Sequence, residues 1–244
     1  MTIKAYIPPT KIKDVIPALQ ELPVTIRPSY YSEDEIIDLK GRKAILKNVI
    51  ADRQKFEAFI ANNQLGFFLI SERVNYSVDL NTRRGFPGLF VEDQGNGLSE
   101  EEAKEILKVV AKVGAVFAFA AAWDEYLHRN RYIRVFGENQ YEGWVGRDIR
   151  KYLPGIYWLT LLSKEHADAI AGIDNTLGAT IAQVGAEHLL VRAFDYPSEW
   201  QNHAVRIDEW LAQQPMFFSK RRILPQLDAA PNIMALSEST AEWR

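Results

Sequence analysis

A carboxylate and an imidazole lie three residues apart in the segment Glu125-Tyr126-Leu127-His128. On a helix this spacing places both side chains on one face, where they could act as two ligands of a metal ion. A carboxylate-bridged metal site needs a second pair of this kind, and the remaining histidines, His166, His188 and His203, supply none. We therefore expect no metal site here, but a partly exposed pair at the edge of a helix.

A second candidate for chemistry is the Asp-x-Gly-x-Gly pattern formed by Asp93, Gly95 and Gly97. It resembles the box of the histidine-kinase and gyrase type ATPases, in which the carboxylate binds the adenine amine. Asn48 also stands on the expected upstream helix, where that family places its magnesium-binding asparagine. The family has a second glycine box for the phosphates, and the glycines after Gly97 form none. A degenerate nucleotide-binding module is therefore the alternative interpretation, and a strand, a Gly-Asn-Gly turn and a capped helix are favoured.

Other catalytic signatures are missing from the chain. It has no cysteine, which excludes disulfides, thiolate metal sites and a cysteine nucleophile. It also lacks a Gly-x-Ser-x-Gly elbow, a His-Glu-x-x-His helix and a phosphate-binding lysine loop. We therefore expect neither enzymatic activity nor a cofactor, while scattered carboxylates such as Asp124 and Asp148 leave a hydrolase open as a third interpretation.

The composition is that of an ordinary globular protein. The chain has 244 residues, of which 47% are hydrophobic and 25% charged, and this length is enough to bury a substantial core. No segment approaches the length of an apolar membrane span, and the first residues lack the apolar core of a signal peptide. We expect a cytoplasmic protein that does not enter a membrane.

The charge balance bears on the kind of partner. The chain carries 29 basic and 32 acidic side chains, a net charge of −3, which does not suit direct binding of nucleic acid. Two basic clusters, Arg147 with Arg150 and Lys151, and Lys220 with Arg221 and Arg222, are expected in solvent at helix ends or turns. The acidic residues are more closely clustered and can steer a basic protein partner. They are Glu92, Asp93, Glu100, Glu101, Glu102 and Glu105.

In the first half of the chain, apolar periodicity predicts helices over residues 11–22 and 43–62 and strands over 66–71, 75–81 and 88–92. Ser99 and Glu102 have the capping-box spacing, so a helix should begin at Ser99. A break is expected near Gly114, and the small-residue run from Ala115 to Ala122 is expected to be a helix packed tightly against a sheet.

In the second half, the run from Gly155 to Ser163 follows Pro154 and predicts a buried strand with Trp158 in the core. A helix over 164–171, strands over 179–184 and 188–194 and a helix over 198–213 should follow it. The fold class is therefore α+β, mainly antiparallel sheets packed by helices, and the element order suggests a duplicated strand-helix-strand-strand-helix unit. We expect one domain over 1–224, with halves of about 24–130 and 150–215, and a peripheral or loose tail over 225–244.

Aromatic residues are concentrated around the glycine-flanked segment Gly143-Trp144-Val145-Gly146. Tryptophan, tyrosine and arginine dominate binding hot spots, because they bury a large area and keep a polar tip. The window also contains basic residues and several more aromatic ones, of which half or more should line the core. These residues are Tyr141, Arg147, Arg150, Tyr152, Tyr157 and Trp158.

The same window carries a family resemblance. The run from Gly155 to Ser163, with Asp148-Ile149-Arg150 before it and Leu189-Leu190-Val191-Arg192 and a helix bearing Trp200 after it, resembles the type VI secretion immunity proteins paired with VRR-Nuc nuclease effectors. The likeness covers roughly residues 65 to 218 and consists of packing motifs. It implies a cytoplasmic protein without catalytic residues that protects its producer by occluding the active site or substrate cleft of a toxin. It leaves a homodimer open.

Such a partner surface should be acidic and aromatic, because the DNA-binding cleft of a nuclease is basic. We expect it among the carboxylates and aromatic residues that periodic packing explains least. These are Asp93, Glu100, Glu101, Glu138, Tyr141, Glu142 and Trp144.

Overall fold

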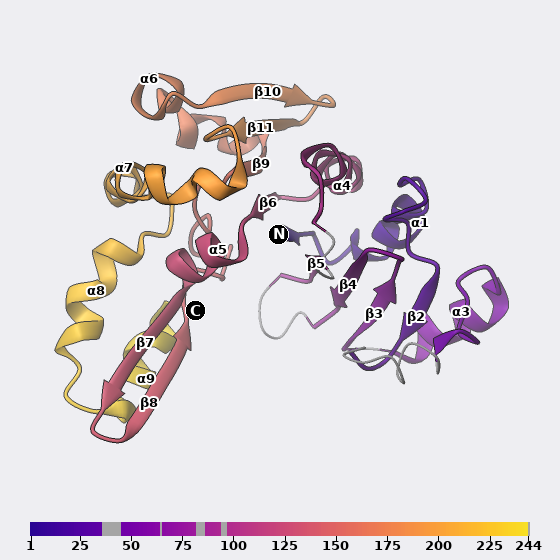
Figure 1. Ribbon diagram of the computed structural model, residues 1–244, viewed down its shortest axis with the longest axis horizontal. Coiled ribbons are helices and arrows are strands. Elements are labelled where there is room, and N and C mark those ends of the chain that lie inside the picture. The colour runs from indigo at the N-terminus through magenta and orange to yellow at the C-terminus, as the bar shows by residue number, and fades with distance from the viewer. Residues whose placement is uncertain (36–44, 64, 82–85, 94–96, 244) are drawn as a thin grey trace. The chain divides into compact units, whose positions relative to one another are not determined.

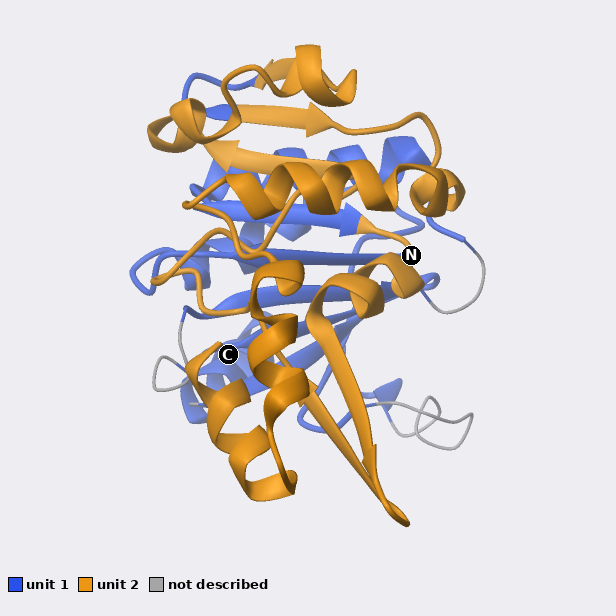
Figure 2. Ribbon diagram, turned by 90° about the vertical axis from the view of Figure 1, so that its left-hand side faces the viewer, with its two compact units in different colours: residues 1–120, 184–188 blue, residues 121–183, 189–244 orange. Residues whose placement is uncertain are grey.

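The computed structural model describes residues 1–35, 45–63, 65–81, 86–93 and 97–243. The chain forms two compact units. Unit 1 comprises residues 1–120 and 184–188, and unit 2 comprises residues 121–183 and 189–244 (Figure 2). The single domain expected over 1–224 stays a prediction. The duplicated strand-helix-strand-strand-helix unit also stays a prediction.

Unit 1 is built on an α+β arrangement with a mainly antiparallel sheet (Figure 1). Its described strands adjoin in the order β6-β1-β5-β4-β3-β2, and every neighbouring pair from β1 to β2 is antiparallel. Alternate residues of β4 are buried, as expected of a strand with one face on a core. The strands are β1 Thr2–Tyr6, β2 Tyr30–Ser32, β3 Gly66–Ile70, β4 Val74–Asp79, β5 Gly88–Asp93 and β6 Phe117–Ala121.

The helix predicted at Ser99 is confirmed as α4, Glu100–Val113. The Ser99 hydroxyl accepts a hydrogen bond from the Glu102 N–H, and the Glu102 carboxylate accepts one from the Ser99 N–H, so both arms of the capping box form. Gly114 ends the helix with a φ of 92°, a left-handed conformation that glycine adopts without a steric penalty.

Two predictions about unit 1 were wrong. Residues 115–122 are not a helix, because they contain strand β6, and every residue of that strand is buried. A strand covered on both faces loses the apolar alternation that would identify it. The helix expected over 43–62 begins only at Arg53, as α3 Arg53–Asn62, with the Asp52 carboxylate accepting from the Lys55 N–H. Its expected start at 43–44 lies outside the described residues. The shorter helix over 11–22 forms as η1 Ile12–Asp14 and α1 Val15–Leu19.

Unit 2 contains a three-strand arrangement, a separate hairpin and several helices. The strands adjoin in the order β10 (Thr180–Val184), β11 (His188–Arg192) and β9 (Leu159–Ser163). The hairpin pairs β7 (Arg131–Phe136) with β8 (Asn139–Trp144). The predicted strand over 155–163 is shorter than expected, but Trp158 is fully buried as predicted. The helices are α5 Trp123–Asn130, η3 Lys164–Ile170, α6 Ile173–Leu177, η4 Pro197–Glu199, α7 Trp200–Gln213, α8 Lys220–Ala229 and α9 Ile233–Glu242.

Residues 225–244, expected to form a peripheral or loose tail, are mostly helical. They complete α8 and form α9, and Leu227 and Leu236 are fully buried in a hydrophobic cluster beneath the β7–β8 hairpin. The Asn232 side chain caps α9 by accepting from the Ala235 N–H. Prolines at 225 and 231 hide the periodicity, since one lies inside α8 and the other separates the two helices. No helix among the described residues is long and apolar enough to cross a membrane.

Candidate functional site

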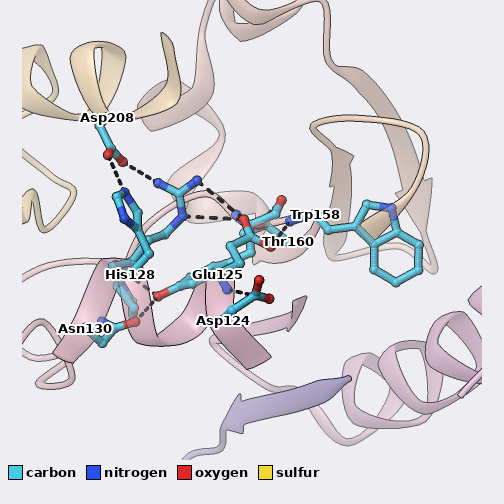
Figure 3. A network of polar contacts seen from close by, with 10 residues as sticks. Asp124, Glu125, His128, Asn130, Trp158, Thr160 and Asp208 are labelled. Carbon is cyan, nitrogen blue, oxygen red and sulfur yellow. Dashed lines mark hydrogen bonds and ion pairs between the residues drawn. The ribbon is translucent and has the colours of Figure 1, made fainter. Parts of the chain in front are cut away.

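Helix α5 in unit 2 carries a polar stripe on its buried side. Glu125 and Arg129 lie one turn apart, and both side chains are almost completely enclosed. Asn130, at the end of the helix, is also buried and accepts from the Tyr157 hydroxyl at 2.7 Å. Figure 3 shows that these groups converge with Asp208 of α7 and with the backbone of Trp158.

Arg129 is held between two carboxylates. Its Nη2 is 3.4 Å from Oε1 of Glu125, and its Nη1 is 2.5 Å from Oδ1 of Asp208. The second Asp208 oxygen lies 2.7 Å from Nε2 of His128. The indole of Trp158 points away from this network, while its backbone N–H faces Glu125 Oε2 at 3.5 Å (Figure 3). The network therefore joins α5, α7 and the segment that leads into β9.

Burial and charge act in opposite directions on the two carboxyl groups. Burial raises the pKa of Glu125 to about 7, although the charge of Arg129 and the Trp158 N–H oppose it. Burial also acts to raise the pKa of Asp208, but its hydrogen bond with His128 and the charge of Arg129 outweigh burial, so this pKa is lowered. Asp208 is thus the permanent anion of the network, and Glu125 is the group that can bind a proton near neutrality.

A pocket of about 480 Å³ opens beside this network, entirely within unit 2. Its volume falls in the range of sites that bind small molecules. The wall is apolar over a large part, and the polar side chains come from α5, β7, α7 and the start of α8. The polar members are His128, Arg129, Tyr132, Asp208, Ser219, Lys220 and Arg221, and the apolar members are Ile133, Pro154, Val205, Leu211, Phe218 and Leu224.

Lys220, the first residue of α8, binds the C-terminal end of α5. Its Nζ donates to the carbonyl oxygens of His128 and Arg131, each at 2.7 Å. A cation at the C-terminus of a helix is favoured, because the last carbonyl groups lack intrahelical donors. Burial lowers the pKa of Lys220, and the nearby charge of Asp208 opposes this effect. Both of its acceptors are neutral carbonyls, so its charge is not paired with a carboxylate in the described part of the unit.

The described lining of this pocket combines polar donors with an apolar wall. Nucleophilic catalysis needs a hydroxyl hydrogen-bonded to a base. Ser219 makes no side-chain hydrogen bond to any described residue, so it is not paired with His128, whose Nε2 lies 2.7 Å from Asp208 Oδ2. Glu125 has a pKa suited to proton transfer, but it is enclosed behind Arg129 and does not line the pocket. The scattered carboxylates Asp124 and Asp148 make separate contacts, with the Glu125 N–H and with Arg150 respectively.

Three of the seven predicted partner-binding residues lie in unit 1. Glu100 and Glu101 come together at the start of α4, where both pair with Lys104, at 2.8 and 3.2 Å. Asp93 is mostly buried at the end of β5, and its Oδ2 accepts from the Leu98 N–H at 3.1 Å. Residues 94–96 of the predicted Gly-Asn-Gly turn lie outside the described residues.

The other four predicted residues lie on or near the β7–β8 hairpin of unit 2. Glu142 and Trp144 share one face of the hairpin, Glu138 is exposed at its turn, and Tyr141 lies on the opposite face with its hydroxyl bonded to Thr240. Trp144 packs against Tyr126 and Trp123, and the Arg147 guanidinium lies 5.3 Å from its ring centre. The structure thus brings Glu142 and Trp144 together and separates Tyr141 from them.

Several expectations about charged residues were wrong. Glu125 is not at a partly exposed helix edge, because its partner is Arg129 one turn later and not His128. The Glu-x-x-x-Arg spacing in the sequence was the signal for this pair. Lys220 is not fully solvated, since it is half-buried and donates to the carbonyls of His128 and Arg131. Arg222 is exposed, as expected, and donates to the Gln214 carbonyl at the end of α7. Ser219 and Asp208 carried no motif that sequence inspection could detect.

The nucleotide-binding pattern is not assembled as the resemblance requires. Asn48 lies in a turn before α3 and not on a helix, and its amide donates to the Tyr31 carbonyl of β2. Strands β3 and β4 separate β2 from β5, which ends at Asp93. The two side chains are therefore attached to elements three strand spacings apart, about 14 Å.

Among the described residues, no group of three or more carboxylate, histidine or cysteine side chains is placed to hold a metal ion. No family model, curated protein or solved structure matches the chain.

Proposed function

We propose that the chain is an immunity protein, which binds a cognate type VI secretion effector nuclease and neutralises it by occluding its active site or substrate cleft. The resemblance of residues 155–163 and their flanks to such proteins suggests the class. The structural observation that supports a binding role most is the outer face of the β7–β8 hairpin. We define this outer face as Arg131, Ile133 and Val135 of β7 with Gln140, Glu142 and Trp144 of β8.

The outer face presents two neighbouring apolar side chains to solvent. Ile133 and Val135 are 43% and 62% exposed, and they face Glu142 and Gln140 across the hairpin. Exposed apolar side chains that adjoin one another and have a polar rim are characteristic of protein interaction sites. This face can therefore bury apolar area when a partner covers it.

The opposite face of the hairpin is fixed to the body of unit 2. Tyr132 packs in the cluster with Leu227 and Leu236, and its hydroxyl donates to Asp228 at 2.7 Å. The Arg134 side chain donates to the Leu227 carbonyl at 2.9 Å. Helices α8 and α9 thus support the hairpin (Figure 1), so little conformational entropy is lost when the outer face binds.

The base of the outer face carries aromatic and charged groups suited to a hot spot. Trp144 stacks with Tyr126 beside Trp123, which is itself exposed. Glu142 forms a 2.7 Å ion pair with Arg131, and Glu138 extends into solvent at the turn. Aromatic anchors with acidic residues at the rim fit a basic cleft, because the acidic charges accelerate association and the aromatic groups slow dissociation.

The test uses the purified nuclease domain of a candidate type VI effector. Its cleavage of a plasmid is measured while the purified protein is titrated in, and cleavage should stop at about one equivalent. Ile133→Asp should raise the concentration needed for inhibition by about tenfold or more. Ile181→Asp is the matched control, because Ile181 is also a strand isoleucine of unit 2 with 43% exposure.

If Ile133→Asp inhibits cleavage as well as the wild type does, the interface lies outside the outer face. Unchanged cleavage in the presence of excess wild-type protein would refute the immunity function itself.

A further inference from the structure

The pocket beside α5 has a polar end with unused hydrogen-bonding capacity. Ser219 is only 3% exposed, yet its hydroxyl has no hydrogen-bond partner among the described residues and it lines the pocket. The Ser219 Oγ is open to the pocket, since the fully buried side-chain atoms without a partner among the described residues are Arg131 Nε and Arg192 Nε, so this hydroxyl can donate to an acceptor that a ligand brings.

The neighbouring Lys220 offers a second donor. An ammonium group has three N–H bonds, and the carbonyls of His128 and Arg131 use two of them. The third has no acceptor in the described part of unit 2. A half-buried positive charge whose acceptors are neutral favours an anion in the adjoining space.

The remaining wall limits what kind of anion fits. Six apolar residues line the pocket, and they suit a hydrocarbon or aromatic body. Arg129 is already paired with the ionised Asp208, and Arg221 with Glu209 at 3.0 Å. The charge of Lys220 therefore remains uncompensated, and the nearby Asp208 is ionised. This balance favours a ligand with one negative charge over a phosphate monoester, which carries two.

We propose that this pocket binds a small monocarboxylate with an apolar body, whose carboxylate accepts from Lys220 Nζ and Ser219 Oγ. The apolar body lies along Val205, Leu211 and Leu224. This binding does not require the effector, and its failure would leave the proposed immunity function untouched.

Hexanoate is the probe, and hexan-1-ol and hexylamine are its matched neutral and cationic analogues. Isothermal titration calorimetry on the full chain should give saturable binding of hexanoate, at least about tenfold weaker binding of hexan-1-ol, and none of hexylamine. Acetate should bind weakly, because it lacks the apolar body. A common affinity for hexanoate and hexan-1-ol, or no hexanoate binding, would overturn the proposal.

Substitutions locate the site. Lys220→Met removes the charge and should abolish hexanoate binding, but it also removes the contacts that close the end of α5. Val205→Asp is therefore the decisive variant, because Val205 is an exposed residue of α7 at the pocket wall and its replacement leaves the core intact.

The new carboxylate in Val205→Asp should weaken hexanoate binding by about tenfold or more, whereas Val205→Lys should not. Val24→Asp introduces the same charge at an exposed valine of unit 1 and should leave binding unchanged. Equal hexanoate affinity of Val205→Asp and the wild type would show that the carboxylate binds elsewhere and would overturn the assignment.

Discussion

Glu125 and Arg129 lie one helical turn apart on α5, with 3.4 Å between Oε1 and Nη2, and solvent is almost fully excluded from both side chains. Arg129 also binds Asp208 at 2.5 Å, so one guanidinium serves two carboxylates. Asp208 makes the shorter contact and stays ionised, and burial raises the pKa of Glu125 to about 7. Two carboxylates of one network thus differ in protonation near neutral pH because their partners and burial differ.

This difference predicts how stability depends on pH. The pKa of Glu125 is about 7 in the folded chain, and its ordinary value is 4.5, so between these values the folded state binds more protons than the unfolded state. The unfolding free energy should therefore fall as pH rises from about 5 to about 8. Asp208, whose folded pKa is lowered, contributes stability that is lost only at more acidic pH.

Glu125→Gln isolates this effect, because glutamine keeps the shape and cannot ionise. The melting temperature of the wild type should fall relative to that of Glu125→Gln by roughly 5–10 °C across this pH range. Differential scanning fluorimetry in matched buffers measures the difference. A constant difference between the two proteins, or one that grows in favour of the wild type, would contradict the raised pKa.

A second prediction concerns the C-terminal helices. Leu227 of α8 is fully buried, and Leu227→Ala should lower the unfolding free energy by about 2–5 kcal/mol. Met234 of α9 is 72% exposed, and Met234→Ala should change the unfolding free energy by less than about 0.5 kcal/mol. Urea unfolding followed by circular dichroism compares them. Equal effects of the two substitutions on the unfolding free energy would show that residues 225–244 form a loose tail.

The sequence predicted elements where one local rule dominated. The capping box at Ser99 and Glu102 predicted the start of α4 to the residue, since both hydrogen bonds are local. Strand β6 was missed because its burial on both faces is decided by the rest of the sheet and not by its own Phe-Ala-Phe-Ala-Ala pattern. The α+β class is confirmed, whereas individual boundaries depended on such tertiary contacts.

The candidate site was harder to predict from the sequence than the fold was. Asp208 and Ser219 come from segments about 80 and 90 residues after Glu125, and their positions follow from packing between helices. Only Arg129 had a local signal, its spacing of four residues from Glu125. The predicted surface residues Glu142 and Trp144 do share a face, because both lie on one strand at even spacing.

The third prediction tests the packing of Trp158. This side chain is fully buried, and its indole N–H donates to the Asp195 carbonyl at 3.3 Å. Trp158→Ala should lower the unfolding free energy by roughly 3–5 kcal/mol, because it leaves a cavity and an unsatisfied carbonyl. Trp123→Ala, at an exposed tryptophan of the same unit, should cost much less. Denaturant unfolding distinguishes them, and a Trp158→Ala protein of wild-type stability would contradict the buried position.

The last prediction concerns nucleotide binding. The Asp93 carboxylate already accepts from the Leu98 N–H and lies 3.9 Å from the N-terminal amine, so an adenine amine would have to compete with both groups. Asn48 is attached beside β2, beyond β3 and β4, and cannot complete a magnesium site with it in the arrangement that the ATPases use. ATP with magnesium should therefore give no binding heat and no shift in melting temperature. A ligand at 100 times its dissociation constant would add about 2.7 kcal/mol, which thermal unfolding detects easily. A clear upward shift with ATP that disappears in Asp93→Asn, but persists in Asp79→Asn at the end of neighbouring β4, would establish the nucleotide-binding alternative.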